Sequence, residues 1–174
     1  KQKPQSGMAR YLLAKTYQAK GLAAQYSQEL GEAISRAPDL LPARLELSKS
    51  FRSGGDPKTA LRIVQGAPVK QTGLAPVVIE KNWSFLQLRD FKQLKQGIEQ
   101  GLKLGRSADL LLQQAILSLY ESRPSVARSL LEEVVATSPQ DLRALELIGV
   151  LYLEGHQQLA WLKRISNHAG GFPN

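Results

Sequence analysis

Cysteine is absent from the 174 residues of this sequence, and only two histidines, His156 and His168, are present. Without cysteine the chain forms no disulfide bond, no thiolate zinc site and no cysteine nucleophile. The two histidines stand twelve residues apart and lack neighbouring acids at ligand spacing, so they do not predict a metal site.

Motifs that mark enzymes are also missing. The sequence contains no dinucleotide-binding glycine loop, no Walker loop and no hydrolase nucleophile elbow. Glu132 and Glu133 are adjacent carboxylates, but neighbouring residues on a helix point about 100° apart and do not converge on one site. We therefore expect neither catalysis nor a cofactor.

Long apolar runs are absent as well, since none reaches the roughly 20 residues that span a bilayer. The sequence begins at Lys1 without an initiator methionine or a signal-like apolar stretch. We interpret it as a mature or excised portion of a longer, bacterial-type protein. The compartment stays open between the cytoplasm and a bacterial periplasm or cell envelope.

Charge is distributed unevenly along the chain. Residues 1–87 carry 13 basic and 6 acidic side chains, a net charge of +7, whereas residues 88–174 carry 10 and 9, a net charge of +1. The basic half could attract an acidic protein, a nucleic acid or an anionic lipid surface. It contains no run of lysine and arginine of the nucleic-acid-binding type, so a solvated surface explains it equally well.

Helix-forming residues dominate the composition, and β-branched residues gather only around Val77, Val78 and Ile79. Large apolar residues recur with a period of 34 in this helical background, and the last step shortens to 33. This series consists of Tyr17, Phe51, Phe85, Leu119 and Tyr152. A parallel series of expected turns consists of Gly21, Gly55, Arg89, Arg123 and His156. The two series predict a 34-residue repeat that lacks one turn residue near Pro124.

The period and its residues resemble the tetratricopeptide repeat, a helix–turn–helix unit. Residues 148–152, Ile-Gly-Val-Leu-Tyr, resemble the Leu-Gly-x-x-Tyr core of the first helix in that family. The small residues Ala60, Ala115, Ala127 and Gly149 stand where two helices cross closely. The third unit departs from the pattern, with Lys81, Arg89 and Gly101 in place of the usual leucine, turn glycine and alanine.

The resemblance implies an all-α fold, a right-handed α-solenoid of stacked antiparallel helix pairs. We expect one domain over residues 1–174, with units at about 7–40, 41–74, 75–108, 109–141 and 142–167. The expected helices span 8–20, 22–37, 41–53, 56–66, 74–88, 90–104, 108–122, 124–137, 140–154 and 157–167. Gly66-Ala67-Pro68 ends the fourth helix, and Asp56-Pro57 and Ser138–Asp141 are typical helix starts.

In the resembled family the first helices line a concave groove that binds a peptide or protein segment. Carried over by register, that groove consists of Tyr11, Lys15, Gln18, Glu46, Lys49, Arg52, Glu80, Trp83, Gln87, Gln113, Gln114, Leu117, Tyr120, Glu146, Val150 and Leu153. Amides could reach a peptide backbone, cations could pair with its acids, and Trp83 or Tyr11 could anchor its side chains, although both could equally serve packing. The resemblance therefore implies a protein-interaction scaffold.

Three other readings remain. An RNA- or polyanion-binding repeat would use the basic N-terminal half, but aromatic residues do not alternate with the basic ones. Self-assembly, or stacking of further repeats, would use an uncapped C-terminal face near Leu159, Trp161, Leu162 and Ile165. A chaperone-type carboxylate clamp is disfavoured, because its five positions hold Tyr11, Lys15, Glu46, Pro76 and Glu80, only one of which is basic.

Overall fold

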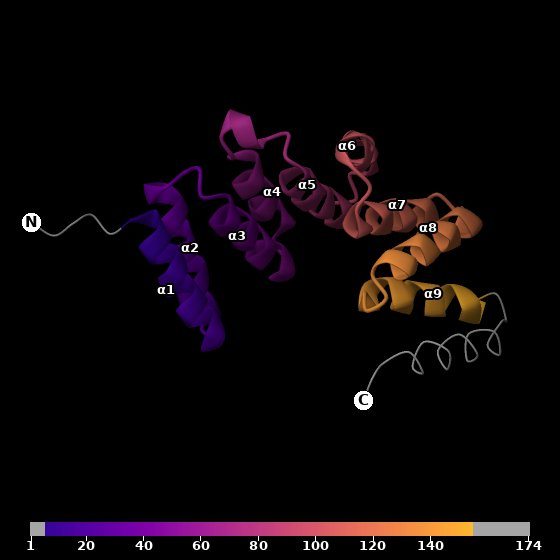
Figure 1. The fold of residues 1–174 in the computed structure, drawn as a ribbon, viewed down its shortest axis with the longest axis horizontal. Helices are drawn as coiled ribbons and strands as arrows, with labels where there is room; N and C mark the ends of the chain where they lie inside the picture. Colours follow the sequence, from indigo (N-terminus) through magenta and orange to yellow (C-terminus); the bar gives the residue numbers. More distant parts are fainter. Residues whose placement is uncertain (1–5, 155–174) are drawn as a thin grey trace, which may run out of the picture. The chain divides into compact units, whose positions relative to one another are not determined.

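The computed structural model describes residues 6–154, and all regular secondary structure in that range is helical. The elements are α1 (Gly7–Ala19), α2 (Ala23–Arg36), α3 (Leu41–Ser53), α4 (Pro57–Gln65), the 3-10 turn η1 (Val69–Gln71), α5 (Ala75–Gln87), α6 (Phe91–Leu104), α7 (Ala108–Tyr120), α8 (Pro124–Thr137) and α9 (Leu142–Glu154) (Figure 1). Every expected helix in this range is confirmed, with ends shifted by two residues or fewer. The expected helix 157–167, the apolar face on it and both histidines lie outside the described residues.

The helices pack as sequential antiparallel pairs within two compact units that meet in sequence between Gly105 and Arg106. In the first unit α1 pairs with α2, α3 with α4, and α5 with α6. The first unit is continuous because α2 also contacts α3, α4 contacts α5, and α3 contacts α5. In the second unit α7 pairs with α8, and α8 contacts α9. No helix in residues 6–154 combines the length and apolar character that a membrane crossing requires.

Each first helix of a pair carries a small or short polar residue at one buried position. This position is occupied by Ala14, Ser48, Asn82, Ala115 and Gly149, all of which are buried. A short side chain lets the two backbones approach closely, and large apolar residues such as Leu30 and Leu131 fill the space beside the crossing.

Asn82 is the bulkiest residue at this crossing position, and the partner helix compensates for it. Gly97 of α6 faces it so closely that a Cβ on Gly97 would lie 1.9 Å from Asn82 Oδ1. Since Asn82 is only 1% exposed, its side chain has no room to move aside. A large polar residue on one helix is therefore matched by a glycine on the other.

The turns inside the pairs share one backbone geometry, and they correct the expected register. Left-handed φ values occur at Gly21 (71°), Gly55 (86°), Arg89 (56°) and Ser122 (57°). The expected turn residue Arg123 instead has the extended φ of −114° that precedes α8. The first helices accordingly begin at residues 7, 41, 75, 108 and 142, so the 33-residue step lies between α5 and α7 and not near Pro124.

The helix starts follow local side-chain chemistry. Asp56 accepts a hydrogen bond from the Thr59 amide at 3.0 Å, and Pro57 follows it at the first helical position, as expected. Asp141 precedes α9 and accepts from the Arg143 amide at 3.1 Å. The expected stop at Gly66 is confirmed too, because α4 ends at Gln65.

Replacing Gly97 with alanine tests the close crossing of α5 and α6. We expect Gly97→Ala to lower the free energy of unfolding by roughly 1–3 kcal/mol, because the new methyl group overlaps the immobile Asn82 side chain. Gly31→Ala is the matched control, since a Cβ there meets nothing within 4 Å and alanine favours the helix by about 1 kcal/mol. Urea denaturation of both variants measures the difference, and destabilisation of equal size would contradict the packing argument.

Replacing Arg89 with glycine tests the turn geometry. Arg89 holds a left-handed φ of 56° that costs a non-glycine residue about 1 kcal/mol, so Arg89→Gly should raise the free energy of unfolding by about 0.5–1 kcal/mol. The same substitution in helical α4, Arg62→Gly, should lower it by about 1 kcal/mol. Thermal denaturation measures both, and a common sign would refute the assignment.

Candidate partner-binding site

The junction between the first two helix pairs is organised around the carboxylate of Glu46 on α3. Tyr11 of α1 donates its hydroxyl to Glu46 Oε1 at 2.7 Å, and Tyr26 of α2 donates to Oε2 at 2.7 Å. Lys15 Nζ donates to both oxygens, at 3.2 and 3.1 Å. The carboxylate is thus satisfied on every side by residues of α1 and α2, which fixes these helices against α3.

This network changes the acidity of its members. Burial opposes the charge on Glu46, but hydrogen bonds from Tyr26, Tyr11 and Lys15 outweigh it and hold the pKa of Glu46 below its usual value. The hydrogen bond to Glu46 raises the pKa of Tyr11 to about 12. Burial, followed by its own bond to Glu46, raises the pKa of Tyr26. Both tyrosines therefore stay protonated and act as donors at neutral pH.

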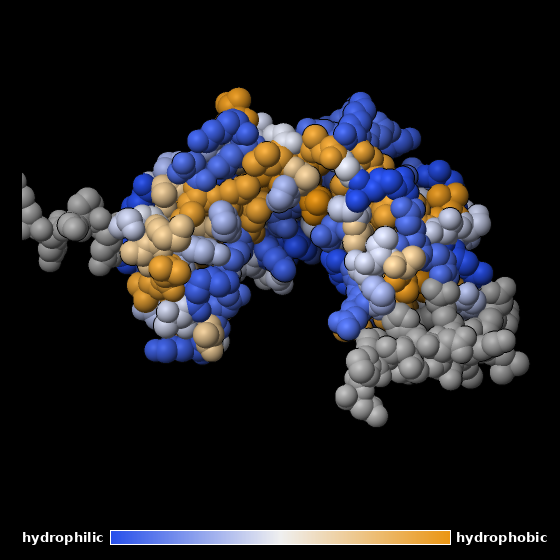
Figure 2. Space-filling view, viewed as in Figure 1, coloured by the Kyte–Doolittle hydropathy of each residue, from blue (hydrophilic) through white to orange (hydrophobic). Residues whose placement is uncertain are grey.

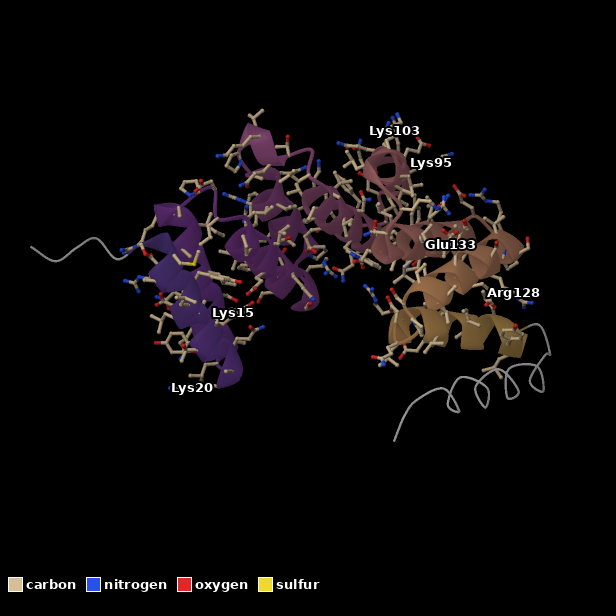
Figure 3. The ribbon with its side chains drawn as sticks, viewed as in Figure 1. Lys15, Lys20, Lys95, Lys103, Arg128 and Glu133 are labelled. Carbon is tan, nitrogen blue, oxygen red and sulfur yellow. The ribbon has the colours of Figure 1, made fainter. Side chains whose placement is uncertain are left out.

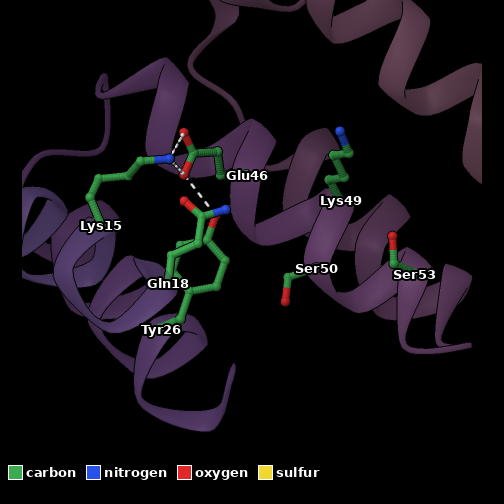
Figure 4. Close-up of a pocket in the computed structure, with 7 residues that line it drawn as sticks. All are labelled: Lys15, Gln18, Tyr26, Glu46, Lys49, Ser50 and Ser53. Carbon is green, nitrogen blue, oxygen red and sulfur yellow. Dashed lines mark hydrogen bonds and ion pairs between the residues drawn. The ribbon is translucent and has the colours of Figure 1, made fainter. Parts of the chain in front are cut away.

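Beside Glu46 lies a hollow of about 350 Å³. Its lining residues come from α1, α2 and α3, and they are Lys15, Gln18, Tyr26, Glu46, Lys49, Ser50 and Ser53 (Figure 4). Ser50 Oγ lies 2.9 Å from Ser27 Oγ, and Lys15 is held by Glu46. Polar side chains of three helices therefore surround a space of the size that proteins use for small ligands or a partner's side chains.

A second polar junction follows between α3 and α5, where Glu80 takes the place of Glu46. Arg52 Nε donates to Glu80 Oε1 at 3.0 Å, and Ser48 Oγ donates to the same atom at 3.1 Å. The guanidinium of Arg52 also lies 5.8 Å from the centre of the Trp83 ring, within cation–π distance. The ion pair is well shielded, since the side chains of Arg52 and Glu80 are 16% and 10% exposed.

The first unit thus brings most of its expected groove residues together, but in different roles. Lys15, Gln18, Glu46 and Lys49 line the hollow, while Tyr11 lies on its edge through Glu46. Arg52 and Trp83 adjoin each other on the next junction, where Trp83 is half-buried and Gln87 exposed. Glu80 is buried and occupied by Arg52, so it supports the surface and does not offer a free carboxylate.

The second unit places its expected residues less favourably. Gln113 is 0% exposed and Leu117 is 6% exposed, so neither presents a binding surface. The corrected register explains this, because residues 113, 116 and 119 of α7 are equivalent to 80, 83 and 86 of α5. Gln114 is half-buried, whereas Tyr120, Glu146, Val150 and Leu153 are exposed.

Sequence reasoning missed the residues of the hollow that lie off the expected groove positions. Tyr26, on the second helix of its pair, forms part of the lining, as do Ser50 and Ser53 on α3. Tyr26 carried a signal, because the residue 34 positions later is the small Ala60. A tyrosine where the next repeat has a helix-crossing alanine indicates a side chain that reaches toward the neighbouring pair.

The arrangement favours recognition by hydrogen bonds and charge. Within residues 6–154 no group of three or more histidine, cysteine, aspartate or glutamate side chains is placed to hold a metal ion. The groups exposed around the hollow are an ammonium, an amide and hydroxyls, contributed by Lys49, Gln18 and Ser53. These groups suit the polar atoms of a bound segment.

The fold is that of tetratricopeptide-repeat proteins. A tetratricopeptide-repeat protein from Parabacteroides merdae matches 99% of this chain and 68% of its own, with a TM-score of 0.79 and 13% identity. PilW, a type IV pilus biogenesis factor, matches 98% of this chain and 81% of its own at a TM-score of 0.79 and 15% identity. The thermophilic protein TTC0263 from Thermus thermophilus matches 86% and 83% at 0.70 and 21% identity. No family model and no curated protein sequence matches.

Replacing Glu46 with glutamine tests the network. Glu46→Gln should lower the free energy of unfolding by about 1 kcal/mol at pH 7, because the charge-assisted bonds from Lys15 and the two tyrosines weaken. The folded pKa of Glu46 lies below its usual value of 4.5, so its charged form stabilises the fold fully above that pH. The difference between wild type and variant should therefore hold above about pH 5 and shrink as the pH falls further.

Glu32→Gln is the control for this experiment. Glu32 pairs with Arg36 on the same helix at 3.3 Å, with 46% of its side chain exposed, and should contribute less than about 0.5 kcal/mol. Urea denaturation between pH 3 and 8 measures both variants. Equal effects of the two substitutions would show that the Glu46 network adds no more than a surface pair.

Proposed function

We propose that the chain is a protein-interaction scaffold that binds a segment of a partner protein along the first-helix face of α1, α3 and α5. The observation that carries the proposal is the polar hollow between α1 and α3, whose neighbouring junction presents Trp83. The fold supports it, because tetratricopeptide repeats are in general protein-interaction modules.

The rigidity of this face also supports binding. Glu46 and Glu80 each tie a first helix to the one before it, through contacts of 2.7–3.2 Å around Glu46 and 3.0–3.4 Å around Glu80. Side chains that are already ordered lose little entropy when a ligand arrives, so preorganisation favours affinity. The polar ties thus hold the surface in shape and leave other groups to contact the partner.

Trp83 is the anchor in this proposal. It is half-buried, and the guanidinium of Arg52 lies over its ring at 5.8 Å. An aromatic side chain that is positioned by its neighbours and still partly exposed has the properties of an interface hot spot. Gln87, one helical turn later and exposed, could pair with a partner's backbone amide.

Site-specific photo-crosslinking in the native host tests the assignment. A photoreactive residue at Ser53 or Gln87, on the proposed face, should yield one common adduct. The same residue at the exposed Lys58 of α4 or Lys92 of α6 should yield none. Adducts of equal yield from all four positions, or from the second pair alone, would contradict the proposed face.

Affinity measurement on the crosslinked partner completes the test. Trp83→Ala should weaken binding by about tenfold or more, as truncation of a hot-spot aromatic does, and Trp83→Phe should keep part of the affinity. Circular dichroism and thermal denaturation confirm that both variants remain folded. Unchanged affinity in a folded Trp83→Ala variant would remove Trp83 from the site.

A further inference from the structure

Lys15 and Lys49 occupy the same position in successive repeats but have different surroundings. They lie 34 residues apart, on α1 and α3, and so do their neighbours Glu46 and Glu80 on the following first helices. Lys15 is paired with Glu46 at 3.1 Å. By repetition Lys49 would pair with Glu80, and it does not.

Arg52 is the reason for the difference. Its guanidinium occupies Glu80 through bonds of 3.0 and 3.4 Å, whereas the equivalent residue one repeat earlier is the uncharged Gln18. Lys49 is consequently exposed and has no hydrogen-bond or ion-pair partner among residues 6–154. The close-up shows its ammonium away from the Glu46 carboxylate (Figure 4).

The hollow contains only one acid, and that acid is satisfied. Glu46 already accepts hydrogen bonds from Lys15 and from two tyrosines, so a cation entering the hollow would find its carboxylate occupied. Lys49, Gln18 and Ser53 have no printed bond and can still donate. An ammonium, an amide and a hydroxyl around one space match the lone pairs of an incoming carboxylate.

We infer that this hollow binds the side-chain carboxylate of an aspartate or glutamate in the partner segment, with Lys49 as its counter-ion and Gln18 and Ser53 as further donors. The inference rests on the proposed function and specifies the chemistry of its ligand. The net charge of +7 over residues 1–87 favours an acidic partner in the same way.

A short acidic peptide is the direct probe. Acetyl-tetraglutamate amide carries side-chain carboxylates and no terminal one, and its binding to the isotope-labelled full chain can be followed by NMR. The largest shifts should occur at the Gln18 side-chain amide, Lys49 and Ser53. Tetraglutamine with a free terminal carboxylate should produce much smaller shifts, which separates a side-chain carboxylate from a chain end.

Lys49→Met removes the charge and keeps most of the side-chain length, and it should weaken tetraglutamate binding about tenfold. Lys20→Met makes the same charge change on an exposed residue of α1 that does not line the hollow, and should change affinity less than twofold (Figure 3). Equal losses in the two variants, or shifts centred on Lys95 and Lys103 of α6, would overturn the inference in favour of general attraction to positive charge.

The crosslinked partner distinguishes failure of this inference from failure of the proposed function. If Ser53 and Gln87 capture a partner whose affinity falls with Lys49→Met but not with Lys20→Met, both stand. If the partner is captured and Lys49→Met has no effect, the proposed face stands and the carboxylate assignment falls. If neither position captures a partner, the proposed face falls, and the tetraglutamate titration alone decides the assignment.

Discussion

Close approach of the first helix of each pair to its neighbours is the constraint on which the rest of the molecule depends. It is met by one buried position per repeat, occupied by Ala14, Ser48, Asn82, Ala115 and Gly149. Where that residue grows to asparagine, the facing residue shrinks to glycine, as at Gly97. Apolar burial on one side of each helix is then free to proceed without strain. The opposite side is left to polar residues, and those form the candidate site.

The polar side of the first unit combines structural and surface roles in one repeat position. Glu46 and Glu80 are equivalent by sequence, and each is neutralised by a cation from the preceding first helix. The cation comes from Lys15 in one junction and from Arg52, nearly a helical turn later, in the other. Since charge pairs tolerate such exchange better than packed apolar contacts do, an array can change its surface without changing its fold.

The period of 34 residues predicted most of the fold, because helix starts, turn residues and crossing residues all repeat with it. It failed where the series of large residues and the series of turns were extended past Phe85 without a test. Both Leu119 and Arg123 fit the period, yet the left-handed turn residue is Ser122. Ser122 gives no glycine-like signal, so the backbone geometry that fixes the register could not be read from residue type.

The candidate site was less predictable for a different physical reason. Register assigns a residue to a helix face, but only the neighbouring side chains decide whether its charge is free. Lys15 and Lys49 share residue type, repeat position and helix face, and differ because Arg52 replaces Gln18 one turn later. Binding capacity in such an array therefore resides in departures from the repeat. A charge that the repeat pattern would have neutralised, and that a substitution nearby releases, becomes available to a partner.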